Sequence, residues 1–402
     1  MSTTSRSAAA DPRTGGGPPA PAGTVAAIAD AVPSGYALAL AAEPGVHDPE
    51  VVAALAAVPR HRLIPRAYLP LDGNRPTTHW RLLDADVDRA AYQALVYSMD
   101  QVVVQLADQP AAGHTVGAVY SGRPCAQSSG AGLLARTLQD LRVRDGDRFL
   151  ELGACTGYLG AAAHLLTGRQ VTGVECDLDL VREATPRLRE IGADVRLLAR
   201  DAVRGIPDGT WDKIAAGFAV PAVPPSWLRR LAPDGVLRTT VNPGAPGWHA
   251  TALVERDEGG AFSGTLTADL WGHVPARGAG WLPVPEQRPA GGAVRTAVLP
   301  PPPHTERGFW VAVGHLLPGV RRRWGPAAGE DVVLVGTDGS RAHIAPDGAT
   351  ATEWGPRALW QLAEDVHERW TAAGGPGTYR LELTGQEQRV VGGTGLHWLL
   401  PL

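Results

Sequence analysis

Short apolar runs alternate with turn residues and amphipathic segments between residues 148 and 241. The apolar segment 149–152 predicts a buried strand, Gly153 and Gly157 bracket a tight turn, and 158–166 has a helical pattern. Further strands are predicted at 170–175, 194–198, 211–216 and 234–241, and further helices at 177–191 and 225–231. Because strands alternate with helices, this region is expected to form a mostly parallel, doubly wound α/β sheet.

The flanking regions have less regular patterns. A helix is expected from Pro49 to Val58, because Asp48 is a suitable N-cap and the apolar stripe has helical period. Residues 1–24 contain few large apolar side chains and predict a tail or linker. The other predicted elements are a helix at 86–97, strands at 102–106, 262–271, 332–344 (a pair), 379–385 and 389–400, a helix at 356–371, and loops at 107–126 and 280–303.

Composition excludes several classes of protein. The chain has 402 residues, a net charge of −4 and a pI near 6.3, which argues against a nucleic-acid partner because phosphate contacts require a basic face. Its three cysteines and twelve histidines show no metal-ligand spacing, so no metal site is expected. Without a signal peptide or a long apolar run, we expect a cytoplasmic protein with no membrane partner.

Glu175 follows the glycine turn by about twenty residues, at the end of the next predicted strand. An acid at this place accepts hydrogen bonds from the two hydroxyls of a ribose. Dinucleotide sites need G-x-G-x-x-G so that the backbone can approach a pyrophosphate, but the spacing here is Gly153-x-x-x-Gly157. S-adenosylmethionine (SAM) has no phosphate and makes no such demand. An ordinary connecting turn is the alternative interpretation.

Two further polar segments are candidates for ligand contacts. Ser128 and Ser129 precede a helical pattern, where a hydroxyl beside free N–H groups suits a carboxylate; plain helix capping is the alternative. Asp201 and Ala202 follow a predicted strand, where the carboxylate and the next N–H suit an adenine ring. A solvated loop aspartate is the alternative there.

From about residue 46 to 245 the chain resembles the protein-L-isoaspartate O-methyltransferase family of SAM-dependent methyltransferases. The segments that carry the resemblance occur in order: His47-Asp-Pro, Val58-Pro-Arg-His61, Ile64-Pro65, Gln127–Gly132, Leu150–Tyr158, Glu175, Asp201, Trp211-Asp-Lys-Ile214 and Leu231–Gly235. Two positions depart from the family pattern. The chain has Ser129-Gly-Ala131 where the family usually has Ser-x-Pro, and Asp201-Ala202 where it favours Asp-Gly.

The resemblance implies a Rossmann-like methyltransferase fold and methyl transfer from SAM to an aspartyl or isoaspartyl carboxylate, with S-adenosylhomocysteine as product. It implies Ser129 as the catalytic residue and Ser128, Gly130 and Ala131 as substrate-binding residues. The implied cofactor-binding residues are Glu151, Gly153, Ala154, Cys155, Thr156, Gly157, Tyr158, Glu175, Cys176, Asp201 and Ala202. Because a side-chain carboxylate ionises with a pKa of about 3.9, no general base is needed.

The implied organisation is a poorly ordered tail at 1–45, a methyltransferase domain at 46–247 and a C-terminal α+β accessory domain at 248–402 that recognises the substrate. Gly272–Gly278, Thr337-Asp-Gly-Ser and Gly355–Trp360 resemble a branch that accompanies lanthipeptides, graspetides and lasso peptides. That branch methylates Asp and leads to aspartimide or isoaspartate. Tryptophans of this region suit either the core or peptide contacts; these are Trp324, Trp354, Trp360, Trp370 and Trp398.

The main hypothesis is therefore an enzyme that methylates Asp in a modified or macrocyclic precursor peptide. The first alternative is a repair enzyme for isoaspartyl damage in proteins. A non-catalytic peptide-binding scaffold with a SAM fold is the second, and a nicotinamide oxidoreductase is disfavoured by the glycine spacing. The sequence does not decide between a monomer and an oligomer.

Overall fold

The computed structural model describes residues 32–72, 79–106, 109–269, 272–279, 281–283, 285, 290–323, 332–345, 348–384 and 386–402. Residues 1–31 of the expected tail lie outside these ranges. The rest of that segment is not a tail, because helix α1 spans Tyr36–Ala41 and buries Tyr36 and Leu40. Helix α2 spans Pro49–Ala57 as predicted, and the Asp48 carboxylate accepts the N–H groups of Glu50 and Val51.

The main sheet has ten strands within the described ranges, in the order β21-β20-β19-β13-β12-β11-β10-β7-β8-β9. The half that runs from β11 to β9 is parallel and consists of β7 (Phe149–Leu152), β8 (Val171–Glu175), β9 (Val195–Ala199), β10 (Trp211–Val220) and β11 (Leu231–Val241). The half that runs from β21 to β12 is antiparallel and consists of β12 (Ala250–Arg256), β13 (Phe262–Ala268), β19 (Thr378–Leu383), β20 (Gln388–Gly393) and β21 (Leu396–Leu399).

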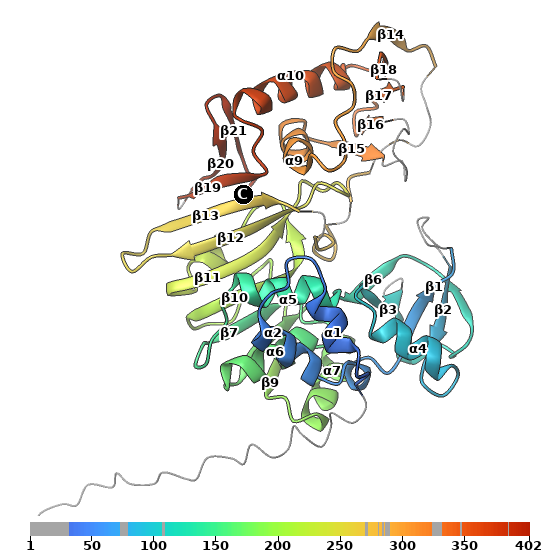
Figure 1. Cartoon of the computed structure of the whole chain (residues 1–402), viewed down its shortest axis with the longest axis vertical. Helices are drawn as coiled ribbons and strands as arrows, with labels where there is room; N and C mark the ends of the chain where they lie inside the picture. Colours follow the sequence, from blue (N-terminus) through green and yellow to red (C-terminus); the bar gives the residue numbers. More distant parts are fainter. Residues whose placement is uncertain are drawn as a thin grey trace, which may run out of the picture.

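The alternation of side chains along the parallel strands separates two hydrophobic cores. Phe149 and Ala215 face the core formed with helices α1, α2, α5 (Ala131–Asp140), α6 (Tyr158–Thr167) and α7 (Leu178–Glu190), which lie on one face of the sheet (Figure 1). Leu150 and Ile214 face the opposite core, which includes α8 (Pro225–Leu228). This arrangement confirms the predicted doubly wound α/β sheet.

The expected boundary at residue 247 does not separate two sheets. Strand β12 pairs with β11 from Val236–Glu255 to Val241–Ala250, and β19 pairs with β13, so the accessory region extends the sheet of the preceding region. Trp248 lies in the core that joins them and is fully buried. The accessory region is therefore built on the main sheet and shares its core.

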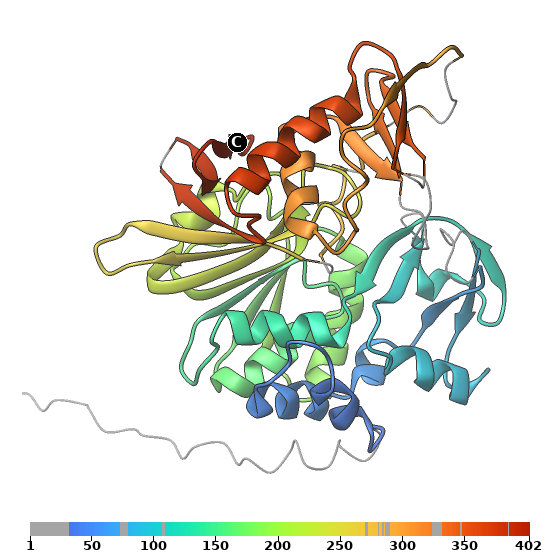
Figure 2. The same ribbon diagram turned by 45° about the horizontal axis from the view of Figure 1, so that its top comes forward.

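A second sheet, in the order β4-β3-β1-β2-β5 with β6 also paired to β3, lies beside the main sheet (Figure 2). Its strands are β1 (Ala67–Pro70), β2 (His79–Leu83), β3 (Val102–Leu106), β4 (Gln109–Pro110), β5 (Val119–Ser121) and β6 (Pro124–Ser128), with α3 (Arg60–Leu63), α4 (Arg89–Val96) and the 3-10 turn Ala111–Gly113 nearby. The prediction of a loop at 107–126 is wrong. Strands β4 to β6 are short and partly exposed, so they lack an apolar pattern.

The third sheet has the order β14-β18-β17-β16-β15 and contacts α10. It consists of β14 (Ala293–Thr296), β15 (Val320–Arg323), β16 (Val332–Gly336), β17 (Arg341–Ile344) and β18 (Thr350–Trp354), with helices α9 (Arg307–Leu316) and α10 (Leu359–Ala372). Trp354, Trp360 and Trp398 are buried, which favours the core interpretation for these side chains. Trp324 and Trp271 lie outside the described residues.

None of the helices within the described ranges is long and apolar enough to cross a membrane.

Replacing Trp248 by alanine tests the shared core. A Cβ on Gly314 of α9 would lie 2.2 Å from the Trp248 ring, so the indole fills the space between the main sheet and this helix. We expect Trp248→Ala to lower the free energy of unfolding by about 3–5 kcal/mol in a single denaturation transition. Leu362→Ala, at a partly exposed position of α10, should cost less than about 1 kcal/mol. Equal effects of the two changes would contradict a shared core.

Candidate functional site

A cavity of about 220 Å³ lies at the carboxyl ends of β7, β8 and β10, which is where open α/β sheets bind ligands. Its wall combines the ends of these strands, strand β6 of the second sheet and the segment 273–277. The lining residues are Cys125–Gln127, Ser129, Gly153, Cys155, Val174–Cys176, Leu180, Arg200–Val203, Gly217, Phe218 and His273–Arg277. Predicted site residues from four separate segments thus meet at one cavity.

The turn after β7 is held in its shape by its own N–H groups. Gly153 and Gly157 have φ values of 80° and 76°, in the left-handed region that favours glycine, and Cys155 has a φ of 50°. The N–H groups of Gly153 and Ala154 both donate to the carbonyl of Val174, at 2.8 and 3.0 Å. Since these amides are already bonded to protein, they are not available to a pyrophosphate.

Glu175 ends β8 and faces the cavity with a nearly buried carboxylate. Its Oε2 accepts the N–H of Cys155 at 2.9 Å, and its Oε1 accepts the N–H of Asp177 at 3.0 Å. The Cys176 thiol also donates to Oε1, at 3.4 Å. Among the contacts of the described residues, Oε2 keeps a second lone pair for another donor.

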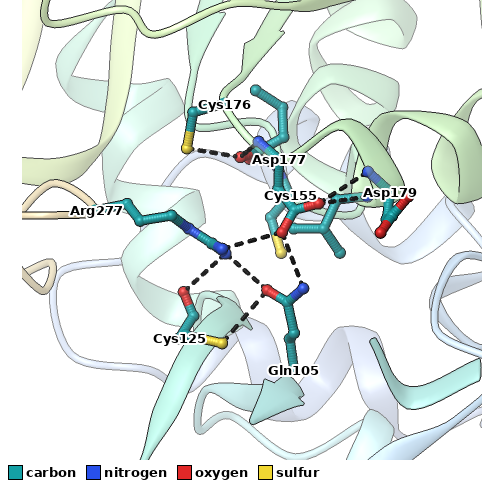
Figure 3. A network of polar contacts seen from close by, with 9 residues as sticks. Gln105, Cys125, Cys155, Cys176, Asp177, Asp179 and Arg277 are labelled. Carbon is teal, nitrogen blue, oxygen red and sulfur yellow. Dashed lines mark hydrogen bonds and ion pairs between the residues drawn. The ribbon is translucent and has the colours of Figure 1, made fainter. Parts of the chain in front are cut away.

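Asp177 connects this strand end to two distant parts of the chain (Figure 3). Its Oδ1 caps α7, while its Oδ2 accepts hydrogen bonds from Gln105 at 2.9 Å and from Arg277 at 3.0 Å. Arg277 also donates to Gln105 Oε1 at 2.6 Å and to the Cys125 carbonyl at 3.3 Å. Burial opposes ionisation of Asp177, but the hydrogen bonds from Gln105, the α7 amides and Arg277 outweigh it and lower its pKa. The network joins the second sheet, α7 and the segment 273–277 along one side of the cavity.

Asp201 and Ala202 lie on the same cavity after β9. The Asp201 side chain is half exposed, accepts the N–H of Val203 at 3.0 Å and pairs with Arg204 at 3.2 Å. Ala202 is buried, and its carbonyl accepts the Trp227 indole N–H. These hydrogen bonds show the ordinary turn role of a loop aspartate, and the adenine contact stays a prediction.

The segment that contains Ser128 and Ser129 is held in place by the fully buried Arg60. The guanidinium donates to the carbonyl of Ser129 at 2.8 Å and to the Ser128 hydroxyl at 3.2 Å. Neither serine caps α5, because Gly130 is the N-cap and no side chain bonds there. Ser129 lines the cavity, whereas the nearly buried Ser128 does not. Gly130 is required sterically, since a Cβ would lie 2.4 Å from the Met99 carbonyl oxygen.

Comparisons with known proteins show the family of the chain. The family profile for Protein-L-isoaspartate(D-aspartate) O-methyltransferase (PCMT) matches residues 89–269. A protein-L-isoaspartate O-methyltransferase of Rhodopseudomonas palustris is 30% identical over 195 residues, which are 48% of this chain and 70% of that protein. The chain belongs to the protein-L-isoaspartate O-methyltransferase family.

Other relatives match over a smaller share of their length. The Methylorubrum populi protein-L-isoaspartate O-methyltransferase is 37% identical over 113 residues, which are 28% of this chain and 52% of that protein. The chain thus spans about half the length of this curated relative. A solved protein-L-isoaspartate O-methyltransferase structure has a TM-score of 0.46 at 18% identity, covering 90% of this chain and 98% of that chain.

Membership of this family agrees with the Rossmann-like methyltransferase fold of the main sheet, but two predicted cofactor-binding side chains point away from the main cavity. The Tyr158 hydroxyl bonds to the Leu55 carbonyl at 2.8 Å and to the Tyr36 hydroxyl at 3.0 Å, and the Tyr158 ring lies under the Arg60 guanidinium. Glu151 points toward Gly160 of α6 and has a buried Oε2 without a hydrogen-bond partner among the described residues. Both side chains therefore pack within the protein and do not line the main cavity. Thr156 and Gly157 likewise lie behind the main cavity, with a Cβ on Gly157 meeting Leu188.

The structure adds residues that the sequence reasoning did not select. They are Arg60, Gln105, Phe218, His273 and Arg277. Arg60 and Arg277 each lie in a segment that carries a family resemblance, and this resemblance was the one sequence signal that could have pointed to them. Gln105 lies within an apolar strand, and only its fully buried polar side chain, visible in the structure, indicates a special role.

Glu151 predicts a pH dependence of stability. Burial, followed by a smaller effect of Glu175, raises the Glu151 pKa from 4.5 to about 8, so the folded state binds this proton more tightly than the unfolded chain. Stability should therefore fall as pH rises from about 4.5 to 8. We expect Glu151→Gln to be more stable than the wild type at pH 8 by on the order of 1–3 kcal/mol, with the difference vanishing near pH 4.5.

Denaturant titrations across this range measure the effect, with the exposed Glu258→Gln as control. A pH-independent difference between wild type and Glu151→Gln would show that Glu151 is ionised in the folded protein.

Proposed function

We propose that this chain is a SAM-dependent carboxyl O-methyltransferase that acts on aspartyl or isoaspartyl carboxylates in proteins or peptides. The observation that carries the proposal is that Glu175 and Ser129, from segments far apart in the sequence, line one cavity at the carboxyl edge of the sheet. The family membership of the chain supports the same reaction.

The residues of the cavity fit SAM better than a dinucleotide. Glu175 would accept the ribose hydroxyls, while Asp201 and the Ala202 N–H would contact the adenine. The amides of Gly153 and Ala154 are bonded to Val174, which suits a cofactor without phosphate. When bound, SAM supplies an electrophilic methyl group on a sulfonium.

Ser129, with the first amides of α5 beside it, would hold one oxygen of the substrate carboxylate. Gly130 and Ala131 contribute backbone to this place, and Ser128 acts indirectly through its bond to Arg60. The carboxylate is ionised at neutral pH, so the chain needs to position it and to exclude water, and no group has to remove a proton.

An isoaspartyl residue in a linear protein segment is the substrate class that the family membership supports directly. A second candidate is an aspartate within a modified or macrocyclic ribosomal peptide, which leads to aspartimide or isoaspartate. One observation favours this narrower substrate: His273 and Arg277, which lie beyond residue 269 where the family match ends, form part of the cavity wall. A site wall contributed by residues outside the family match suits an unusual substrate.

Transfer of labelled methyl from SAM to peptides tests the proposal. We expect base-labile methyl esters on an isoaspartyl peptide or on an Asp-containing macrocycle, and we expect Ser129→Ala to lower kcat/KM by about 10–100-fold because one carboxylate contact is lost. Ser121→Ala, in β5 and away from the cavity, is the matched control.

The preferred peptide separates the two substrate classes. Efficient methylation of short linear isoaspartyl peptides favours repair, and selective methylation of the macrocycle favours peptide tailoring. Peptide binding without SAM binding or methyl transfer would identify a non-catalytic scaffold and contradict the proposal.

A further inference from the structure

Residues 272–279, called the strap below, lie beyond the family match at 89–269 and cross the cavity. The Ala219 N–H at the end of β10 donates to the Val274 carbonyl at 2.7 Å, and the Ala276 N–H donates back to the Ala219 carbonyl at 3.0 Å. Arg277 fixes the other end through Asp177 and Gln105 (Figure 3). The strap is thus held at several points, and its side chains have defined positions.

His273, on the strap, is 5% exposed and pairs with Thr240 of β11. The His273 backbone N–H donates to Thr240 Oγ1 at 3.2 Å, and the same oxygen lies 3.0 Å from His273 Nδ1. The hydroxyl has one proton, and among the contacts of the described residues Nδ1 is its acceptor, so we assign the proton of the neutral ring to Nε2. Burial lowers the His273 pKa to about 3, so the ring is neutral at physiological pH.

His273 stands at the junction of two cavities. A second cavity, of about 160 Å³, lies beside the first and is also lined by Gly130 and the start of α5. The residues that line both cavities are Gln127, Ser129 and His273. A group transferred from a cofactor in the first cavity to a substrate in the second would pass beside these shared residues.

We infer that His273 donates a hydrogen bond from Nε2 to the substrate carboxylate oxygen that Ser129 also holds, from the side opposite Ser129. The other carboxylate oxygen is thereby directed at the methyl group. This inference rests on the proposed function. The attacking oxygen forms the new O–C bond, the C–S bond breaks, and its electron pair stays on sulfur, so no proton is transferred and His273 acts only as a positioning donor.

A neutral donor suits this reaction better than a cation. A cationic donor adds coulombic attraction to the hydrogen bond that an ionised carboxylate accepts. The carboxylate loses its charge as the ester forms, so a cation would stabilise the ground state more than the transition state and would slow the transfer. The burial of His273 and its bond to Thr240 provide orientation without that cost.

The test compares His273→Ala and His273→Gln with the wild type. We expect His273→Ala to lower kcat/KM for the peptide substrate by about 10–100-fold. We also expect it to weaken binding of this peptide to the complex of the enzyme with S-adenosylhomocysteine by about tenfold. Calorimetry should show unchanged affinity for S-adenosylhomocysteine itself. Glutamine, which keeps an N–H donor, should regain most of the loss. His315→Gln, at a half-buried histidine of α9 that lines neither cavity, is the control.

Thr240→Val provides a second variant should His273→Ala not fold. Loss of the hydroxyl should lower kcat/KM by about 3–10-fold in the wild type and have no further effect in the His273→Ala background, because Thr240 acts through the ring. Nitrogen NMR of the imidazole should show the proton on Nε2 in the wild type.

The outcomes separate this inference from the proposed function. Wild-type activity with unchanged His273→Ala kinetics and peptide affinity would overturn the inference alone. A limb of the pH profile between pH 5 and 8 that His273→Gln abolishes would overturn it too, by showing that the ring exchanges a proton. Absence of methyl transfer by the wild type to every carboxyl peptide would overturn both.

Discussion

The Glu175 carboxylate accepts one backbone N–H from the turn after β7 and one from the start of α7. These two bonds fix the carboxylate at the edge of the sheet and tie the glycine turn to the neighbouring strand. Asp177 extends the connection, since it donates its N–H to Glu175 and binds Arg277 of the strap through its side chain. This one strand end thus connects the main cavity to the second sheet and to the strap.

The accessory region contributes to the site because it grows out of the same sheet. Strand β12 pairs with β11, whose end carries Thr240, and the chain then returns through the strap to the carboxyl edge. A region attached by a flexible linker would not place His273 and Arg277 reproducibly at the cavity. The continuous sheet and the shared core around Trp248 provide that rigidity.

The sequence predicted the parts of the molecule that depend on short-range patterns. The strand, turn and helix over 149–166, Glu175 at a strand end and the Asp48 cap all follow from local periodicity and turn chemistry. The contacts of Arg277 with Gln105 span 172 residues, and no local pattern encodes them. The same holds for the pairing of β19 with β13, which continues the main sheet beyond residue 247, and for the exposed strands within 107–126.

A crystal structure of the chain with S-adenosylhomocysteine tests the central claim most directly. The account predicts the ribose hydroxyls on the Glu175 carboxylate, the adenine beside Asp201 and Ala202, and the sulfur facing Ser129. A ligand bound elsewhere, with the Glu175 carboxylate contacting only the amides of Cys155 and Asp177, would contradict it.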